Sequence, residues 1–144
     1  MYIPQERILL DQHFTDASEA LTKIGEYLVN QEIVSLPYVK SLLRRHQKTG
    51  VYIGNFVALP HAEEEAQQWI KEEGLFLIQV PDGVDFGTKE QPKIATILFV
   101  VVLKEQQLAV LQEIAFFCSD MQNVRVLSDA ESVEEIQQIL LAEE

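Results

Sequence analysis

His61 is the residue whose setting most suggests chemistry. It follows an apolar segment, Phe56–Leu59, and then Pro60, and it precedes a stretch, Ala62–Lys71, whose spacing predicts a helix. That order would place an imidazole where backbone N–H groups and the positive end of a helix dipole face an incoming anion. An imidazole nitrogen is a fair nucleophile near neutral pH, and the phosphoramidate that it forms can pass a phosphoryl group on. A phosphoryl carrier is therefore one interpretation of this setting, and a histidine that only caps the helix is the other; these residues alone leave both open.

Arg45 is the best candidate for a partner of His61. It lies in a stretch, residues 33–62, that contains no carboxylate in an otherwise acidic chain. The basic residues there are Lys40, Arg44, Arg45 and Lys48, with His46 and His61 beside them. Phosphoryl transfer depends on cationic or N–H groups that hold the phosphoryl oxygens, which Arg45 could supply. A helix whose basic face is only solvated would show the same pattern.

Capping patterns and apolar spacing predict the elements that must position these two residues. Helices are expected from Asp16, which has Glu19 three residues on, from Pro37 to Gly50, over 62–71, over 106–119, and after the Ser128–Glu131 capping pattern. Strands are expected over 56–59, 75–80 and 94–103, with a turn at 81–83, whereas 124–127 has no clear preference. The predicted inner face of 106–119 is formed by Leu108, Leu111, Ile114, Ala115 and Cys118. Strands that alternate with helices, without a repeat or a linker, predict one layered α/β domain over residues 1–144.

Composition excludes several classes of protein. The 144 residues include 11 basic and 23 acidic ones, a net charge of −12, which argues against a nucleic-acid partner. The single cysteine, Cys118, excludes a disulfide framework, and no His/Cys cluster has the spacing of a metal site. The longest apolar run, Ile94–Leu103, has ten residues, against the roughly 20 that span a bilayer. Since Met1–Asp16 also lacks the pattern of a signal peptide, the sequence predicts a cytoplasmic protein that is not inserted in the membrane and has neither metal nor cofactor.

The segment Tyr52–His61, read as YIGNFVALPH, resembles the phosphohistidine motif of enzyme IIA domains. These are domains of the mannitol/fructose class in the bacterial phosphoenolpyruvate-dependent sugar phosphotransferase system. The similarity continues through Val80–Thr88 and Leu108–Asp120, and stand-alone mannitol-type subunits are the most similar within the class. The resemblance implies a mixed sheet, of about five strands, that is flanked by helices, and it implies no sugar pocket in this chain.

The resemblance also implies a function and its partners. His61 would accept a phosphoryl group from the phosphocarrier HPr and pass it to a cysteine of a cognate enzyme IIB, which serves the membrane subunit IIC. Arg45 falls where the family has an arginine on the preceding helix, and it would steady the phosphoryl oxygens. No cofactor is implied.

Two departures from the family pattern bear on the site. Gln107 occupies the place of a second active-site histidine; an amide can donate a hydrogen bond to a phosphoryl oxygen but carries neither proton nor charge. That leaves open a non-catalytic regulatory module in which transfer has been weakened or lost. The second departure is Ala62, where the family commonly has glycine, followed by the carboxylates Glu63–Glu65, which we expect to point into solvent.

Overall fold

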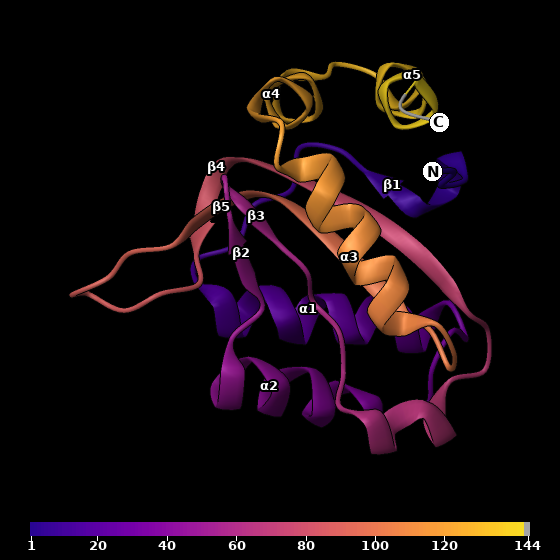
Figure 1. Cartoon of the computed structure of the whole chain (residues 1–144). Helices are drawn as coiled ribbons and strands as arrows, with labels where there is room; N and C mark the ends of the chain where they lie inside the picture. The colour runs from indigo at the N-terminus through magenta and orange to yellow at the C-terminus, as the bar shows by residue number, and fades with distance from the viewer. Residues whose placement is uncertain (143–144) are drawn as a thin grey trace.

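The computed structural model describes residues 1–142, and Figure 1 shows a central sheet with helices on both sides. The strands are β1 (Ile8–Leu9), β2 (Tyr52–Gly54), β3 (Val57–Ala58), β4 (Gly74–Asp85) and β5 (Ile94–Val102). The α-helices are α1 (Ala17–Asn30), α2 (Tyr38–Thr49), α3 (Gln107–Cys118), α4 (Met121–Asp129) and α5 (Val133–Ala142). Two short 3-10 helices are η1 (Gln5–Arg7) and η2 (Glu64–Trp69).

The strands form one sheet in the order β1-β4-β5-β3-β2. β1 is parallel to β4 and β3 is parallel to β5, whereas the β4–β5 and β2–β3 pairs are antiparallel. The prediction of an α/β fold with a mixed sheet of about five strands is confirmed. The predicted domain extended to residue 144, and residues 143–144 lie outside the described part of the chain.

Both faces of the sheet are covered, and β5 shows how. Leu98 and Val100 belong to the core formed with α1 and α2, whereas Ile97, Phe99 and Val101 belong to the core formed with α3, α4 and α5. All five side chains are fully buried. A strand buried on both faces reads as a continuous apolar run, so the predicted central strand is confirmed.

The helices that flank the site begin and end where local chemistry requires. At the start of α1, Asp16 Oδ1 accepts a hydrogen bond from the Glu19 amide (2.8 Å), and Glu19 Oε1 accepts one from the Thr15 amide (3.1 Å). The first bond satisfies a free N–H group of the first turn, as the sequence predicted, and the second ties Glu19 to the residue before the cap. Helix α2 ends at Gly50, whose φ of 74° is open to glycine and strained for other residues. The chain then turns directly into β2.

Two predicted elements next to His61 differ in the structure. The strand predicted over 56–59 is limited to Val57–Ala58, because Asn55 and Phe56 have φ values of 52° and 66°, which a strand does not allow. The helix predicted over 62–71 is only the 3-10 helix η2, over Glu64–Trp69. The inward spacing of Ala66 and Trp69 fits three residues per turn as well as 3.6, so the apolar pattern does not distinguish the two helices.

Two further differences lie elsewhere in the chain. The turn predicted at 81–83 does not end a strand: β4 continues to Asp85, with a register shift against β5 between Gln79 and Val84. The segment 124–127, without a clear preference in the sequence, lies inside α4. Since α4 runs to Asp129, the last helix is capped instead by Ser132, whose Oγ accepts from the Glu135 amide (3.2 Å).

Helix α3 forms as predicted, but only part of its predicted inner face is buried. Ile114, Phe117 and Cys118 are buried, whereas Leu108 is 68% exposed and Ala115 is also exposed. Apolar residues lie on all sides of this helix, so their spacing does not select one inner face. An apolar surface is therefore left uncovered along α3.

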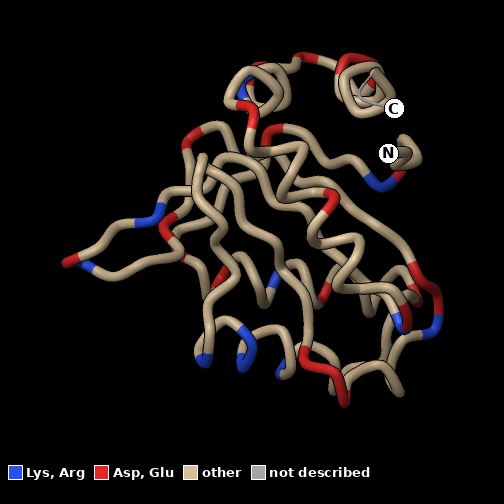
Figure 2. The backbone as a smooth tube through the Cα atoms, viewed as in Figure 1, with Lys and Arg blue, Asp and Glu red and all other residues tan. Residues whose placement is uncertain are grey.

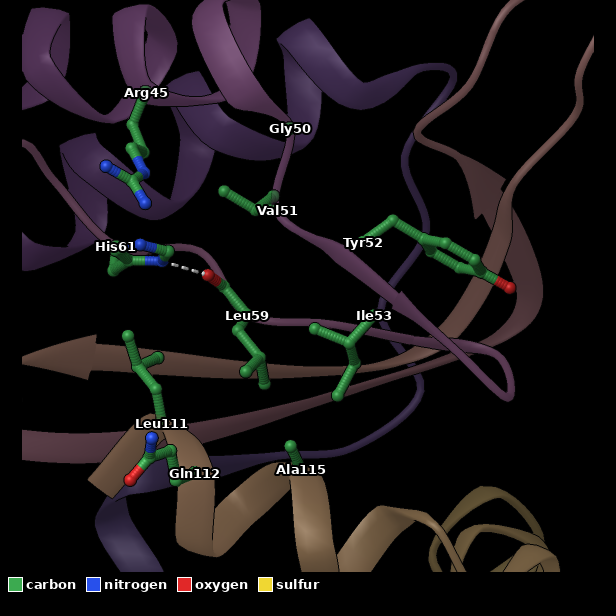
Figure 3. A pocket seen from close by; sticks show the side chains of 10 residues that line it. All are labelled: Arg45, Gly50, Val51, Tyr52, Ile53, Leu59, His61, Leu111, Gln112 and Ala115. Carbon is green, nitrogen blue, oxygen red and sulfur yellow. Dashed lines mark hydrogen bonds between the residues drawn. The ribbon is translucent and has the colours of Figure 1, made fainter. Parts of the chain in front are cut away.

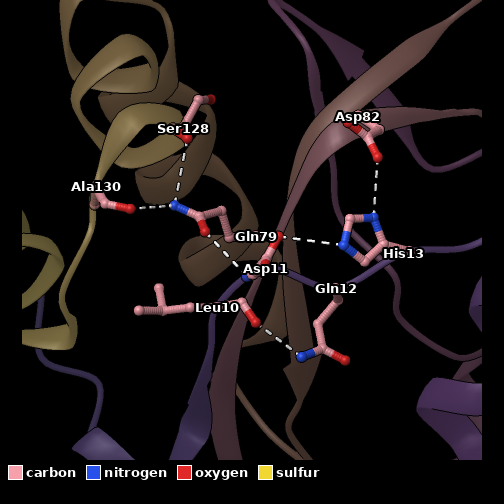
Figure 4. A network of polar contacts seen from close by, with 8 residues as sticks. All are labelled: Leu10, Asp11, Gln12, His13, Gln79, Asp82, Ser128 and Ala130. Carbon is pink, nitrogen blue, oxygen red and sulfur yellow. Dashed lines mark hydrogen bonds and ion pairs between the residues drawn. The ribbon is translucent and has the colours of Figure 1, made fainter.

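Gln79 of β4 is a buried amide that joins three segments of the fold (Figure 4). Its Nε2 lies 3.0, 3.3 and 2.9 Å from the carbonyl oxygens of Leu127, Ser128 and Ala130, and its Oε1 accepts from the Asp11 amide at 3.0 Å. Because a buried amide without partners would be costly, these bonds hold the α4–α5 connection and the chain after β1 against the sheet.

Candidate functional site

His61 lies where the chain leaves the sheet after β3. The Leu59 amide donates to the Val51 carbonyl (2.8 Å), and the Val101 amide of β5 donates to the Pro60 carbonyl (3.0 Å). Pro60 has no N–H to satisfy, and its ring fixes one backbone angle. Backbone hydrogen bonds to the residue before β2 and to β5 thus hold the two residues before His61. These bonds fix the backbone position from which the imidazole projects.

The imidazole of His61 is buried, with only 6% of the residue exposed. Its Nδ1 lies 2.6 Å from the carbonyl oxygen of Leu59. A carbonyl oxygen only accepts hydrogen bonds, so Nδ1 carries the proton and Nε2 carries the lone pair. Nε2 is buried and has no hydrogen-bond partner among residues 1–142.

The surroundings of His61 keep its ring neutral. Burial lowers the pKa of His61 below the usual 6.5; the hydrogen bond to Leu59 acts in the opposite direction, and the charge of Arg45 lowers the pKa further. In the neutral ring with its proton on Nδ1, the lone pair lies on Nε2. The structure thus shows which nitrogen has the lone pair, which the sequence does not reveal.

A pocket of about 290 Å³ opens beside the ring (Figure 3). Its walls come from α2, from the chain around β2 and β3, and from α3. The lining residues are Arg45, Gly50, Val51, Tyr52, Ile53, Leu59, His61, Leu111, Gln112 and Ala115. Most of this wall is apolar, which strengthens any charge interaction inside the pocket.

Arg45 reaches into this pocket from α2, on the side toward which the free nitrogen of His61 points in Figure 3. Its Nε is buried, and no hydrogen bond or ion pair of its guanidinium is formed within residues 1–142. A guanidinium presents several N–H donors in a planar fork that matches phosphoryl oxygens. The structure thus brings together the two residues that the sequence singled out, and in the described part of the chain neither the imidazole Nε2 nor the guanidinium has a hydrogen-bond partner.

The backbone amides after His61 do not face the pocket as the sequence suggested. The Ala62 amide hydrogen-bonds the Tyr38 hydroxyl, and the Glu63 amide donates to Ser41 Oγ (2.9 Å). Both partners are buried side chains of α2. With these donors occupied and only a 3-10 helix following, the expected helix N-terminus beside His61 is absent from the described structure, and Arg45 remains as the charged donor.

The expectation for the three carboxylates after Ala62 is wrong for one of them. Glu64 and Glu65 are exposed, but the Glu63 side chain is only 11% exposed and turns back onto α2. It accepts hydrogen bonds from Arg44 Nε (2.9 Å) and Lys48 Nζ (2.7 Å), which lower the pKa of Glu63. One carboxylate therefore pairs with two of the basic residues of α2 next to the site, and Figure 2 shows basic positions in blue along this helix.

Gln107, the residue in place of a second histidine, does not line the pocket. It is the first residue of α3 and is partly exposed, whereas Gln112, more than one turn further on, forms part of the wall. No pattern in the sequence singles out Gln112, because its place depends on which face α3 turns toward His61. Of the three candidate site residues, the pocket contains His61 and Arg45 but not Gln107.

The other reactive residues show structural roles. Cys118 is buried, and burial raises its pKa to about 12, so the thiol is unreactive. Exposed His13 pairs with Asp11 and Asp82, and the His46 ring meets the Phe86 ring edge-on. Among residues 1–142, no cluster of His, Cys, Asp and Glu could hold a metal ion, and no helix is long and apolar enough to cross a membrane.

Residues 1–143 match the family described as "Phosphoenolpyruvate-dependent sugar phosphotransferase system, EIIA 2", so the chain belongs to this family. It is thus an enzyme IIA component, a phosphotransferase that works through a phosphohistidine intermediate. It is 46% identical over 130 residues to the mannitol-specific phosphotransferase enzyme IIA component of Enterococcus faecalis, with 90% of each chain covered. It is 36% identical to that of Geobacillus stearothermophilus, over 96% of this chain and 94% of the relative.

Solved structures agree with this assignment. The crystal structure of IIA mannitol from Escherichia coli has a TM-score of 0.88 at 28% identity, with 97% of this chain and 99% of that chain covered. A second structure, a complex of that enzyme IIA with phosphorylated enzyme IIB, has a TM-score of 0.88 at 27% identity, with 97% of each chain covered. The nitrogen regulatory protein IIA-Ntr from Neisseria meningitidis shares the fold, at 23% identity and a TM-score of 0.80 over 95% of this chain and 94% of that one.

Proposed function

We propose that this chain is the enzyme IIA of a mannitol phosphotransferase system and that Nε2 of His61 carries the phosphoryl group. The names of the relatives support mannitol as the sugar and enzyme IIB as the acceptor. The observation that carries the assignment to His61 is the bond from Nδ1 to the Leu59 carbonyl, which leaves Nε2 free beside Arg45. Phospho-HPr is the proposed donor, and the protein would work in the cytoplasm.

The proposed reaction has two steps in which one phosphoryl group moves. First, the Nε2 lone pair attacks the phosphorus of phospho-HPr, and the bond from phosphorus to HPr breaks with its electron pair remaining on HPr. Second, a cysteine thiolate of enzyme IIB attacks the same phosphorus, and the electron pair of the broken P–N bond returns to His61. Arg45 donates to the phosphoryl oxygens in both steps and offsets their charge.

Because Nε2 is buried in the free protein, the pocket must open when a partner docks. The uncovered apolar surface of α3 is suited to that contact. Leu108, Gln112 and Phe116 are spaced four residues apart and so lie along one side of the helix, and Gln112 lines the pocket. Phe116 is 81% exposed, and exposed apolar surface beside a reactive group is typical of a protein-binding site.

Replacing Phe116 with serine should weaken the binding of HPr and enzyme IIB about tenfold, because a large apolar contact of the interface is lost. The rate of transfer at saturating partner should stay within about twofold, since Phe116 does not line the pocket. Calorimetric titration with each partner measures the affinities. Tyr2→Ser is the matched control, because Tyr2 is also an exposed aromatic residue (63%) that does not line the pocket. Equal affinities of the two variants would rule out α3 as the docking surface.

The rate of phosphorylation should fall as the pH drops through the lowered pKa of His61. Only the neutral ring has a lone pair on Nε2, and burial keeps this form dominant down to a pH below 6.5. The midpoint of the decline in rate should therefore lie below pH 6.5. Stopped assays with phospho-HPr, with the His61 ring titrated in parallel by NMR, measure both midpoints; a midpoint at or above 6.5 would contradict the proposed neutral nucleophile.

One incubation tests the proposed function as a whole. The protein is mixed with phosphoenolpyruvate, enzyme I and HPr, and its intact mass is measured before and after enzyme IIB is added. One acid-labile phosphoryl group that appears and then passes to enzyme IIB is the expected result. A phosphoryl group that stays on the protein would favour the regulatory module, and no incorporation at all would refute the carrier function.

A further inference from the structure

Glu63 connects the segment that carries His61 with the helix that carries Arg45. Its carboxylate accepts from Arg44 Nε at 2.9 Å and from Lys48 Nζ at 2.7 Å, and both donors belong to α2. These are charge-assisted hydrogen bonds, the stronger kind, and the carboxylate that accepts them is largely withdrawn from solvent. Because Glu63 is only two residues from His61, the bonds that hold Glu63 against α2 also restrict the position of His61.

The backbone of the same segment is also tied to α2. The Glu63 amide donates to Ser41 Oγ, and the Ala62 amide bonds the Tyr38 hydroxyl. Both of these bonds are made by backbone groups and would survive a change of side chain at position 63. The carboxylate is therefore the part of this connection that depends on Glu63 itself.

The lysine and arginine residues in the second half of α2 point in two directions, toward the Glu63 carboxylate or into the pocket. Arg44 and Lys48 are one helical turn apart and both turn toward Glu63. Arg45, the next residue along the helix, turns into the pocket instead, where its Nε is buried without a partner. While Glu63 holds the two neighbouring cations, α2 keeps one orientation against the His61 segment and Arg45 keeps one position against the ring.

We propose that Glu63 is a positioning residue for phosphoryl transfer, which fixes Arg45 against His61 by tying the His61 segment to α2 through Arg44 and Lys48. The inference rests on the proposed role of His61. It assigns Glu63 no contact with the phosphoryl group. A guanidinium held in place in advance needs no reorganisation as the phosphoryl group arrives, and small misplacements of such a group slow a reaction severely.

The test compares Glu63→Gln with Glu64→Gln, which removes the same charge from an exposed neighbour. At saturating phospho-HPr, Glu63→Gln should phosphorylate about tenfold more slowly, with KM within about twofold of wild type. Glu64→Gln should match wild type in both. Thermal unfolding of each variant confirms that the protein is folded at the assay temperature.

A double-mutant cycle with Arg45→Ala separates positioning from a general structural effect. If Glu63 acts through Arg45, Glu63→Gln should cost less than about twofold in rate once Arg45 is absent. An undiminished tenfold loss in the Arg45→Ala protein, or identical rates for Glu63→Gln and Glu64→Gln, would overturn the proposal.

A measurement on the unphosphorylated protein keeps this inference separate from the proposed function. The Nε–H signal of Arg45 in 15N NMR should exchange slowly with solvent in wild type and Glu64→Gln, and at least about tenfold faster in Glu63→Gln, because local opening then exposes this group. If wild type accepts no phosphoryl group, the proposed function fails and this exchange rate alone decides the role of Glu63. Equal exchange rates in all three proteins would refute it.

Discussion

The variant His61→Ala should take up no phosphoryl group from phospho-HPr and pass none to enzyme IIB. In the proposed mechanism, the imidazole supplies the only atom of this chain that bonds to phosphorus, so its loss removes the intermediate. Intact mass after incubation with phosphoenolpyruvate, enzyme I and HPr measures the effect directly. Removal of a nucleophile is the largest rate effect that we expect from any single substitution in this chain.

The other two histidines provide matched controls. His13 is exposed between two aspartates and His46 lies against Phe86, so His13→Ala and His46→Ala should both be phosphorylated as wild type is. In the wild-type protein, 15N and 31P NMR should place the phosphorus on Nε2 of His61. Phosphorylation that persists in His61→Ala, or phosphorus bonded to Nδ1, would contradict the assignment.

The second largest effect is expected for Arg45→Ala, which should slow phosphorylation about a hundredfold. The guanidinium is a charged donor among the mostly apolar residues that line the pocket, so charge that builds up on the phosphoryl oxygens loses its main partner. Single-turnover rates in rapid-quench experiments measure the chemical step apart from binding of HPr.

Two further variants show which property of Arg45 matters. Arg45→Lys tests the geometry of the guanidinium, and Lys40→Ala is the control for loss of a positive charge from α2. Lysine keeps the charge without the planar fork of donors, so Arg45→Lys should recover only part of the rate. Lys40 is an exposed residue of the same helix, and Lys40→Ala should lie within about twofold of wild type. If Arg45→Ala were no slower than Lys40→Ala, the guanidinium would have no role in transfer.

Elements whose pattern is local could be predicted from the sequence. The hydrogen bond from the Glu19 amide to Asp16 begins α1 as expected, and the uniform apolar run at β5 correctly indicated a strand buried on both faces. His61 and Arg45 could also be selected, because the apolar segment and proline before one, and the carboxylate-free stretch around the other, are visible in the residues alone.

The parts that could not be predicted depend on contacts between distant segments. Glu63 turns to α2 because Arg44 and Lys48, 19 and 15 residues earlier, come to lie beside it only after folding. The face of α3 was likewise undetermined, since apolar residues surround that helix, and with it the place of Gln112 at the pocket. The order of residues along the chain does not show which helix a segment will pack against, or which face that helix will turn toward it.

In the proposed mechanism, the bond between His61 Nδ1 and the Leu59 carbonyl affects the release of the phosphoryl group as well as its capture. Once Nε2 is bonded to phosphorus while Nδ1 keeps its proton, the ring is cationic, and the carbonyl dipole stabilises that cation. A cationic imidazole departs readily, because it leaves as a neutral ring when a thiolate attacks. One backbone oxygen therefore keeps the captured group reactive, so that the exchange runs easily in either direction.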